Sequence, residues 1–250
     1  MSVKIRAWGS MKDQGETLFA GHVGVALAIG RIERRVNVGL FVTAALLLDF
    51  VLWLFIFLGW ESAYIPEDFS ATHQPHFVFP YSHGLMAAGG WSAAAGVLTL
   101  LLYPYLKEAK WRAAALVVGA TFSHWLLDVL VHRSELPLIG NTSATVGLAL
   151  WNNMPSALAV EAAIVTLGLY LFLPKSGLAL GKSIALGILI LIVLMFTIIG
   201  MTIAPPPPSA SAMAGSSLVA LVVVCGLIAW LGRVSREERF STSLSVDRHD

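Results

Sequence analysis

Long runs of apolar residues, rather than narrow apolar stripes, dominate this chain. Six runs are long enough to span the roughly 30 Å hydrocarbon core of a bilayer, and they cover residues 36–59, 83–106, 111–131, 155–174, 183–204 and 216–232. A soluble domain of this length would show apolar positions at helical or strand spacing with polar residues between them. The pattern predicts an all-α fold, a polytopic membrane helix bundle with six long transmembrane helices.

A seventh apolar segment, TLFAGHVGVALAIG (17–30), is shorter than these six. As a helix it would be about 21 Å long, which is less than the thickness of the hydrocarbon core. We therefore predict one short N-terminal hydrophobic helix in addition to the six. It could be a tilted short span, a re-entrant piece or an interfacial helix, and the sequence leaves these three alternatives open.

Composition agrees with a membrane protein. Of the 250 residues 57% are hydrophobic and 12% are charged, whereas a soluble domain has about 25% charged residues. Cys225 is the single cysteine, which excludes a disulfide framework and a cysteine-based metal site. The first residues are too polar for a signal peptide, so we expect the first hydrophobic segment to be retained.

The positions of lysine and arginine predict the orientation, because cytoplasmic loops are enriched in both. With the arginines after segment 17–30 in the cytoplasm, the six spans also place there Lys107, Lys110, Arg112, Lys175, Lys182, Arg233, Arg236, Arg239 and Arg248. Among the residues after position 30, only Arg133 falls outside. We predict a multi-pass protein with a cytoplasmic C-terminus. Charge alone also favours a cytoplasmic N-terminus, which carries Lys4, Arg6 and Lys12.

The chain divides into two predicted parts. Residues 1–175 form a helix bundle that carries the polar site, and residues 176–250 form two apolar helices with a charged cytoplasmic tail. The two helices are joined by a linker that holds Pro205 to Pro208 and a small-residue spacer up to position 215. The outer loop 132–154 is unusually apolar, and we expect Trp151 in it to anchor at the membrane interface.

Ionisable residues within the spans are the candidates for chemistry. A charged carboxylate at the centre of a membrane helix costs about 2.5–3.5 kcal/mol, so such residues usually pair, bind a cation or serve a function. Asp49 lies near the middle of the first long span, and the stretch SHWLLDVLVHR carries His124, Asp128 and His132 at intervals of four on one helix face. Most of the candidates fall in the outer halves of their helices, namely His83, His124, Asp128, His132 and Glu161. This placement predicts a funnel open to the outside, with Asp49 near its floor.

Imidazole together with carboxylate suits a divalent metal, zinc or manganese before others. The candidate metal ligands are His22, Asp49, His83, His124 and Asp128, and the candidate catalytic residues are Glu161, His132 and Arg133. Each also has a simpler explanation. A membrane histidine is often a hydrogen-bond partner between helices, Arg133 could extend to the interface, and Glu161 could pair with Arg133.

In order along the chain, the motifs GHVGVALAIG, ALLLDF, PYSHGL, SHWLLDVLVHRSELPL and GLALWN, with Glu161 downstream, resemble those of a bacterial inner-membrane family. Its members are usually labelled membrane-bound metal-dependent hydrolases. The resemblance covers residues 17 to about 175 and implies site residues at His22, Asp49, the Ser82–His83 pair, His124 and Asp128. The chain departs from the family pattern at Gly84, where serine is common, and at Glu135, which replaces an aspartate.

Two functions remain open, beside a third alternative in which the protein is a scaffold and the polar cluster only fixes helix packing. The first is a metal-dependent hydrolase of the bacterial inner membrane, acting from the outer leaflet on a lipid or lipid-linked phosphoester, with Glu161 or His132 as general base or orienting group. The second is a transporter that uses the same His/Asp cluster to relay protons or bind a cation. Membrane lipid is the expected partner, no nucleic acid is expected, and the sequence is silent on oligomeric state.

Overall fold

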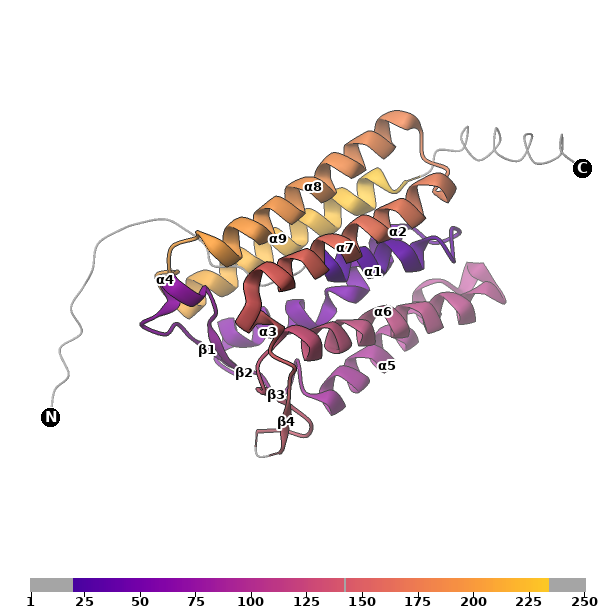
Figure 1. Cartoon of the computed structure of the whole chain (residues 1–250). Helices are drawn as coiled ribbons and strands as arrows, with labels where there is room; N and C mark the ends of the chain where they lie inside the picture. The colour runs from indigo at the N-terminus through magenta and orange to yellow at the C-terminus, as the bar shows by residue number, and fades with distance from the viewer. Residues whose placement is uncertain (1–19, 142, 234–250) are drawn as a thin grey trace, which may run out of the picture.

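Helices form most of the structure (Figure 1). The computed structural model describes residues 20–141 and 143–233. Its α-helices are α1 (Ala20–Gly30), α2 (Val38–Ala45), α3 (Leu47–Leu58), α4 (Phe69–Thr72), α5 (Leu85–Leu102), α6 (Ala109–Val131), α7 (Met154–Phe172), α8 (Leu180–Thr202) and α9 (Ala210–Leu231). Short 3₁₀ helices follow at η1 (Pro104–Leu106), η2 (Leu150–Asn153) and η3 (Leu173–Lys175). The predicted all-α class is confirmed.

Two small antiparallel hairpins lie near one end of the bundle. Strand β1 (Ser62–Tyr64) pairs with β2 (His76–Val78), so that Ala63 faces Phe77. Strand β3 (Leu136–Pro137) pairs with β4 (Thr145–Val146). Both hairpins belong to loops that were predicted to lie outside the membrane, and they close that end of the bundle around the site described below.

Within the described residues, five helices are long and apolar enough to cross a membrane, and α2 with α3 makes a sixth span if the bent pair counts as one. The six membrane spans predicted from the apolar runs are therefore present if the bent pair counts as one span. One boundary differs, because α9 begins at Ala210 and the small-residue spacer is helical. Ser209 caps this helix by accepting a hydrogen bond from the Ala212 N–H at 3.1 Å, and it follows the proline run that cannot itself be helical.

The first long span is broken rather than continuous. Helices α2 and α3 meet at Leu46 with a bend of 49°. Ala45 ends α2, and carbonyl groups in the last turn of a helix lack a partner further along the same helix. The break therefore supplies a backbone acceptor inside the bundle, four residues before Asp49.

Helix α1 lies within the bundle, packed against α7, α2 and α6. Gly24 allows this packing, since a Cβ at that position would lie 2.6 Å from the Ile164 carbonyl oxygen and from Val165 Cα. Gly168 of α7 faces Gly24 in return. Small residues of this kind let two membrane helices approach closely. The segment is thus a helix packed among other helices of the bundle, and its depth in the membrane stays a prediction. Lys4, Arg6 and Lys12 fall outside the described residues.

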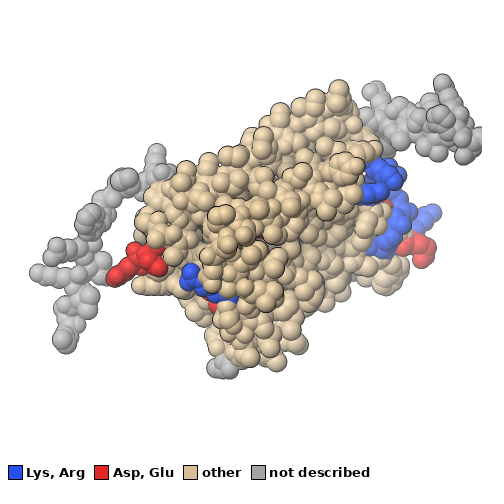
Figure 2. Space-filling view, in the orientation of Figure 1, with Lys and Arg blue, Asp and Glu red and all other residues tan. Residues whose placement is uncertain are grey.

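The two ends of the bundle differ in charge. Figure 2 shows most of the visible lysine and arginine atoms at one end, with one further basic group toward the other end. At the basic end the Glu33 carboxylate lies 2.7 Å from Arg35 Nη2 and 2.7 Å from Arg112 Nη2. Helix α6 begins at this basic end and carries His124 and Asp128 in its last two turns, so the His/Asp residues lie toward the opposite end. This is the polarity that the charge pattern predicted, although the membrane side of each end stays a prediction.

Helices α8 and α9 complete the bundle by packing on α7, α2 and α3. Asn37 ties α2 to α9, because its side-chain amide donates to the Ala229 carbonyl at 2.9 Å. Leu186, Ile190 and Ile228 join the same hydrophobic core as Val23 and Phe41. The predicted division of the chain at residue 176 stays a prediction, and the charged tail 234–250 lies outside the described residues.

Candidate metal centre

Five buried side chains from four parts of the chain converge in the bundle. His22 comes from α1, Asp49 from α3, His83 from the turn before α5, and His124 with Asp128 from α6. Each is at most 4% exposed. Two overlapping sets each bring three ligand atoms within 4.8 Å of one another: His22, His124 and Asp128 in the first, and Asp49, His83 and His124 in the second. The structure thus brings together all five residues that the sequence singled out as candidate ligands.

The tightest contacts join His83, His124 and Asp128. The two Nε2 atoms of His83 and His124 are 3.2 Å apart. Asp128 Oδ2 is 3.2 Å from His124 Nε2 and 3.4 Å from His83 Nε2. Ligand atoms around a tetrahedral ion with bonds of 2.0–2.1 Å are separated by about 3.3 Å, so these three atoms have the spacing of a shared metal ion.

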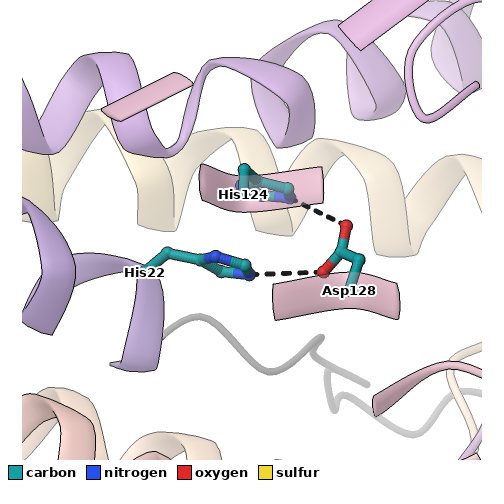
Figure 3. A group of neighbouring side chains, drawn as sticks. All are labelled: His22, His124 and Asp128. Atoms are coloured by element: carbon teal, nitrogen blue, oxygen red, sulfur yellow. Dashed lines mark ion pairs between the residues drawn. The ribbon is translucent and has the colours of Figure 1, made fainter. Parts of the chain in front are cut away.

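Asp49 and His22 lie at two sides of this group. Asp49 Oδ1 is 3.7 Å from His124 Nε2 and 3.8 Å from His83 Nε2. His22 Nε2 is 3.4 Å from Asp128 Oδ1, and its ring stacks on His124 with centroids 3.8 Å apart. Figure 3 shows the Asp128 carboxylate with one oxygen directed at each of these two imidazoles.

The unused donor and acceptor atoms fit a cation. Asp49 Oδ2 and His22 Nδ1 are buried and have no hydrogen-bond partner in the described part of the chain, whereas Asp128 Oδ2 lies 3.2 and 3.4 Å from two imidazole Nε2 atoms. A buried acceptor without a partner costs about 1–3 kcal/mol, and more if it is charged. A metal ion would offset this cost for the Asp49 carboxylate, and imidazole with carboxylate is a donor set that divalent metals accept. The cluster could therefore hold a metal ion.

Neighbouring groups fix the orientation of two of the imidazoles. His124 Nδ1 donates to the Ala45 carbonyl at 2.6 Å, which is the acceptor supplied by the break between α2 and α3. His83 Nδ1 is 2.8 Å from Ser82 Oγ. With Nδ1 engaged in this way, each ring directs Nε2 at the cluster, as partners outside a metal site commonly do.

Glu61 supports the Ser82–His83 pair from the loop after α3. Its Oε1 atom accepts hydrogen bonds from the backbone N–H groups of Tyr81 at 2.8 Å and of Ser82 at 2.9 Å. Burial raises the pKa of the Glu61 carboxyl, and the hydrogen bonds from Ser82 and Tyr81 act against that shift. No sequence spacing links Glu61 to the Ser82–His83 pair, because the contact depends on how the loop with the β1–β2 hairpin folds.

Glu161 lies beside α1 rather than within the cluster. Its Oε2 atom accepts from the Gly21 N–H at 2.6 Å, in the first described turn of α1. A carboxylate there also interacts favourably with the helix dipole. Glu161 therefore holds the helix that carries His22, and among the described residues it forms no ion pair with Arg133.

His132 borders the cluster, after the end of α6. Its Nδ1 atom is 2.6 Å from Glu135 Oε1, and its ring lies 4.1 Å from that of Trp151. With Asp49, His83 and Asp128 it lines a small enclosed cavity of about 10 Å³, which is space for roughly one water molecule. The predicted funnel open to the outside is therefore wrong, because the side chains around this cavity close it. Trp151 lines this cavity too and is 4% exposed, so it packs inside the protein instead of anchoring at the interface.

Arg133 does not reach this cavity. It is half-buried and lines a separate, open cleft together with Gln74 and Trp151. The structure therefore groups the five candidate ligands with His132. Glu161 instead contacts the backbone of α1, and Arg133 lines the separate cleft.

Comparison of the chain with protein-family models, with curated proteins and with solved structures finds no match.

Proposed function

We propose that the protein is a membrane-embedded, metal-dependent hydrolase with a His/Asp centre. The observation that carries the proposal is the spacing of His83 Nε2, His124 Nε2 and Asp128 Oδ2, which lie 3.2–3.4 Å from one another in a buried site. Hydrogen-bonded membrane histidines alone would not require a second buried carboxylate, that of Asp49, with an oxygen that lacks a hydrogen-bond partner in the described residues.

His83, His124 and Asp128 would hold the ion, with Asp49 and His22 as further ligands on its two sides. Zinc or manganese would suit these donors. When bound, such a metal supplies a Lewis acid and lowers the pKa of water so that a nucleophile forms near neutral pH. We also propose that the chain belongs to the bacterial inner-membrane family that its motifs resemble, with the buried site nearer the outer face of the membrane.

His132 is the candidate general base. Because the Glu135 carboxylate holds Nδ1 at 2.6 Å, Nε2 is the ring atom left to exchange a proton in the cavity. Glu161 would act indirectly, by fixing α1 and with it His22. A substrate that is a lipid or lipid-linked phosphoester fits a site at membrane depth, and Arg133 would attract its phosphate.

Elemental analysis of the purified protein tests the metal. We expect a stoichiometric divalent metal in the wild type and its loss in Asp128→Asn and His124→Ala. His76→Ala is the matched control, since His76 is exposed on β2 and belongs to neither ligand set. A metal-free wild-type protein that takes up a solute with protons in liposomes would contradict the hydrolase.

The broken span favours transport as a second candidate. Discontinuous helices form the binding sites of many transporters, and the break at Leu46 lies three residues before Asp49. Transport predicts that a solute gradient dissipates in proteoliposomes and that Asp49→Asn abolishes this flux, whereas the hydrolase predicts release of a product without flux.

A further inference from the structure

An open cleft lies next to the candidate metal centre, on the other side of Trp151. It encloses about 590 Å³ and is formed by the segment of α4 and the turn after it, by the residues that follow α6, and by the facing ends of α7 and α8. Its lining residues are Ser70, Ala71, Thr72, His73, Gln74, Arg133, Trp151, Asn152, Met154, Met201 and Thr202. Trp151 also lines the small cavity of the cluster, so the indole borders both spaces.

The cleft has a positive charge and no acid among its lining residues. Within the described residues the guanidinium of Arg133 makes no ion pair and no hydrogen bond, although Glu135 is only two positions away, because the Glu135 carboxylate is engaged by His132. The side chain is half-buried rather than extended into solvent. A guanidinium with five donors and no acceptor beside a cleft is suited to bind a phosphate or carboxylate.

Two residues that line the cleft, Gln74 and Trp151, also carry buried polar atoms without partners in the described part of the chain. Gln74 is 5% exposed; its Nε2 donates to the Trp151 carbonyl at 3.0 Å, while its Oε1 has no partner. Trp151 is 4% exposed, and its indole Nε1 likewise has no partner in the described residues.

Apolar and polar walls meet in the cleft. Met154 and Met201 belong to the ends of two membrane-spanning helices, α7 and α8, whereas Arg133 and Asn152 belong to loops. Such a site can hold a charged headgroup and the first carbons of an attached chain at once. Methionine adapts its shape to irregular apolar ligands.

We propose that this cleft binds a phosphate-bearing ligand, with Arg133 as its cation and Trp151 as the partition between the ligand and the His/Asp cluster. Transfer of the ligand to the cluster rests on the proposed function, but binding in the cleft does not. Because the inner cavity has room for roughly one water, Trp151 and the 3₁₀ helix η2 must shift before a phosphoester reaches the cluster.

Binding measurements on the purified full chain test the proposal without any assay of activity. The probes are inorganic phosphate and a short-chain phosphatidic acid below its micelle concentration, each titrated by calorimetry in a neutral detergent. We expect Arg133→Gln to weaken binding about tenfold or more, the loss expected for a charge-assisted hydrogen bond. Arg133→Lys retains the charge but not the planar guanidinium. Its affinity for the probes should lie between those of the wild type and Arg133→Gln.

Two controls separate this proposal from the hydrolase. Arg34→Gln removes one positive charge at the basic end of the bundle and should leave binding unchanged. Asp128→Asn should lose the metal and keep phosphate binding, so a failed metal analysis with intact binding would contradict only the hydrolase. Binding of both probes indicates recognition of the phosphate itself, and binding of the lipid alone indicates a lipid headgroup. No binding of either probe, or equal binding by wild type and Arg133→Gln, would overturn the cleft proposal.

Discussion

His124 donates from Nδ1 to the carbonyl oxygen of Ala45 over 2.6 Å. This bond joins α6 to the break between α2 and α3 and directs Nε2 of the same ring at Asp128, 3.2 Å away. A departure from helical regularity in one span thereby orients a candidate metal ligand in another.

Two substitutions of His124 separate its structural contact from its ligand role. Asparagine can place its amide N–H near the former Nδ1 position but has no atom at the former Nε2 position. We therefore expect His124→Asn to lose the metal yet retain more thermal stability than His124→Ala, which loses both. Unfolding midpoints and metal content of the two variants provide the measurement; equal midpoints would show that the bond to Ala45 contributes little.

The two carboxylates of the cluster should differ in their effect on metal affinity. Asp128 Oδ2 lies 3.2 and 3.4 Å from the two imidazole Nε2 atoms, whereas Asp49 Oδ1 lies 3.7 and 3.8 Å from them. We expect Asp128→Asn to raise the metal dissociation constant at least about tenfold more than Asp49→Asn, a difference of about 1.4 kcal/mol. Competition with a chromogenic chelator measures both constants, and the reverse order would make Asp49 the principal ligand.

Close packing of α1 on α7 should make Gly24 intolerant of a methyl group. The added Cβ of Gly24→Ala would lie 2.6 Å from the backbone of α7, which cannot rotate away. We expect a loss of about 1–3 kcal/mol in stability, together with weaker metal binding because His22 would be displaced. Gly89→Ala in α5 is the matched control, since its Cβ would meet nothing within 4 Å; an equally unstable control would point to a general effect of the substitution.

Acid should weaken the basic end of the bundle through Glu33. Hydrogen bonds from Arg35, then from Arg112, lower the pKa of Glu33 to about 2. Since the pKa is lowered on folding, the ionised carboxylate stabilises the fold fully above its ordinary value near 4.5 and loses this effect as the pH falls toward 2. Both arginine side chains are more than half exposed, so the contribution is limited to about 1–2 kcal/mol by solvent screening.

Glu33→Gln provides the measurement for this effect. The difference in unfolding midpoint between wild type and variant should be constant from pH 7 to 5 and should shrink below about pH 4.5. A difference that grows toward low pH would contradict the assignment of the pairing to the ionised form.

Orientation in the membrane can be measured by cysteine labelling. Cys225 is buried and should give little background. A cysteine in place of exposed Ala144, in the β3–β4 hairpin loop, should react with an impermeant maleimide added outside intact cells, and one in place of exposed Glu108 should not. The opposite pattern would put the candidate centre and the Arg133 cleft on the cytoplasmic side.

The sequence by itself determined the helical class, the six apolar spans and the identity of the candidate ligands. In a bilayer an apolar run of this length forms a helix, because each backbone N–H and C=O group must find its hydrogen-bond partner within the same segment. Each ionisable side chain in an apolar segment carries a free-energy cost, so it can be recognised from the sequence alone. The candidate ligands selected in this way were His22, Asp49, His83, His124 and Asp128.

Tertiary structure decided which of these side chains meet and what surrounds them. Helix α1 enters the bundle because Gly24 and Gly168 let two backbones approach, a property of the pair that neither segment reveals alone. The Ala45 carbonyl, Glu61 and Trp151 act at the site through a helix break and loop contacts between residues distant in sequence. Glu161 and Arg133 were selected by charge, but the packing of α1 and the position of Trp151 separate them from the ligands. The free-energy cost of an ionisable side chain in an apolar segment can be recognised from the local sequence. Which of these side chains come together depends on how the helices pack.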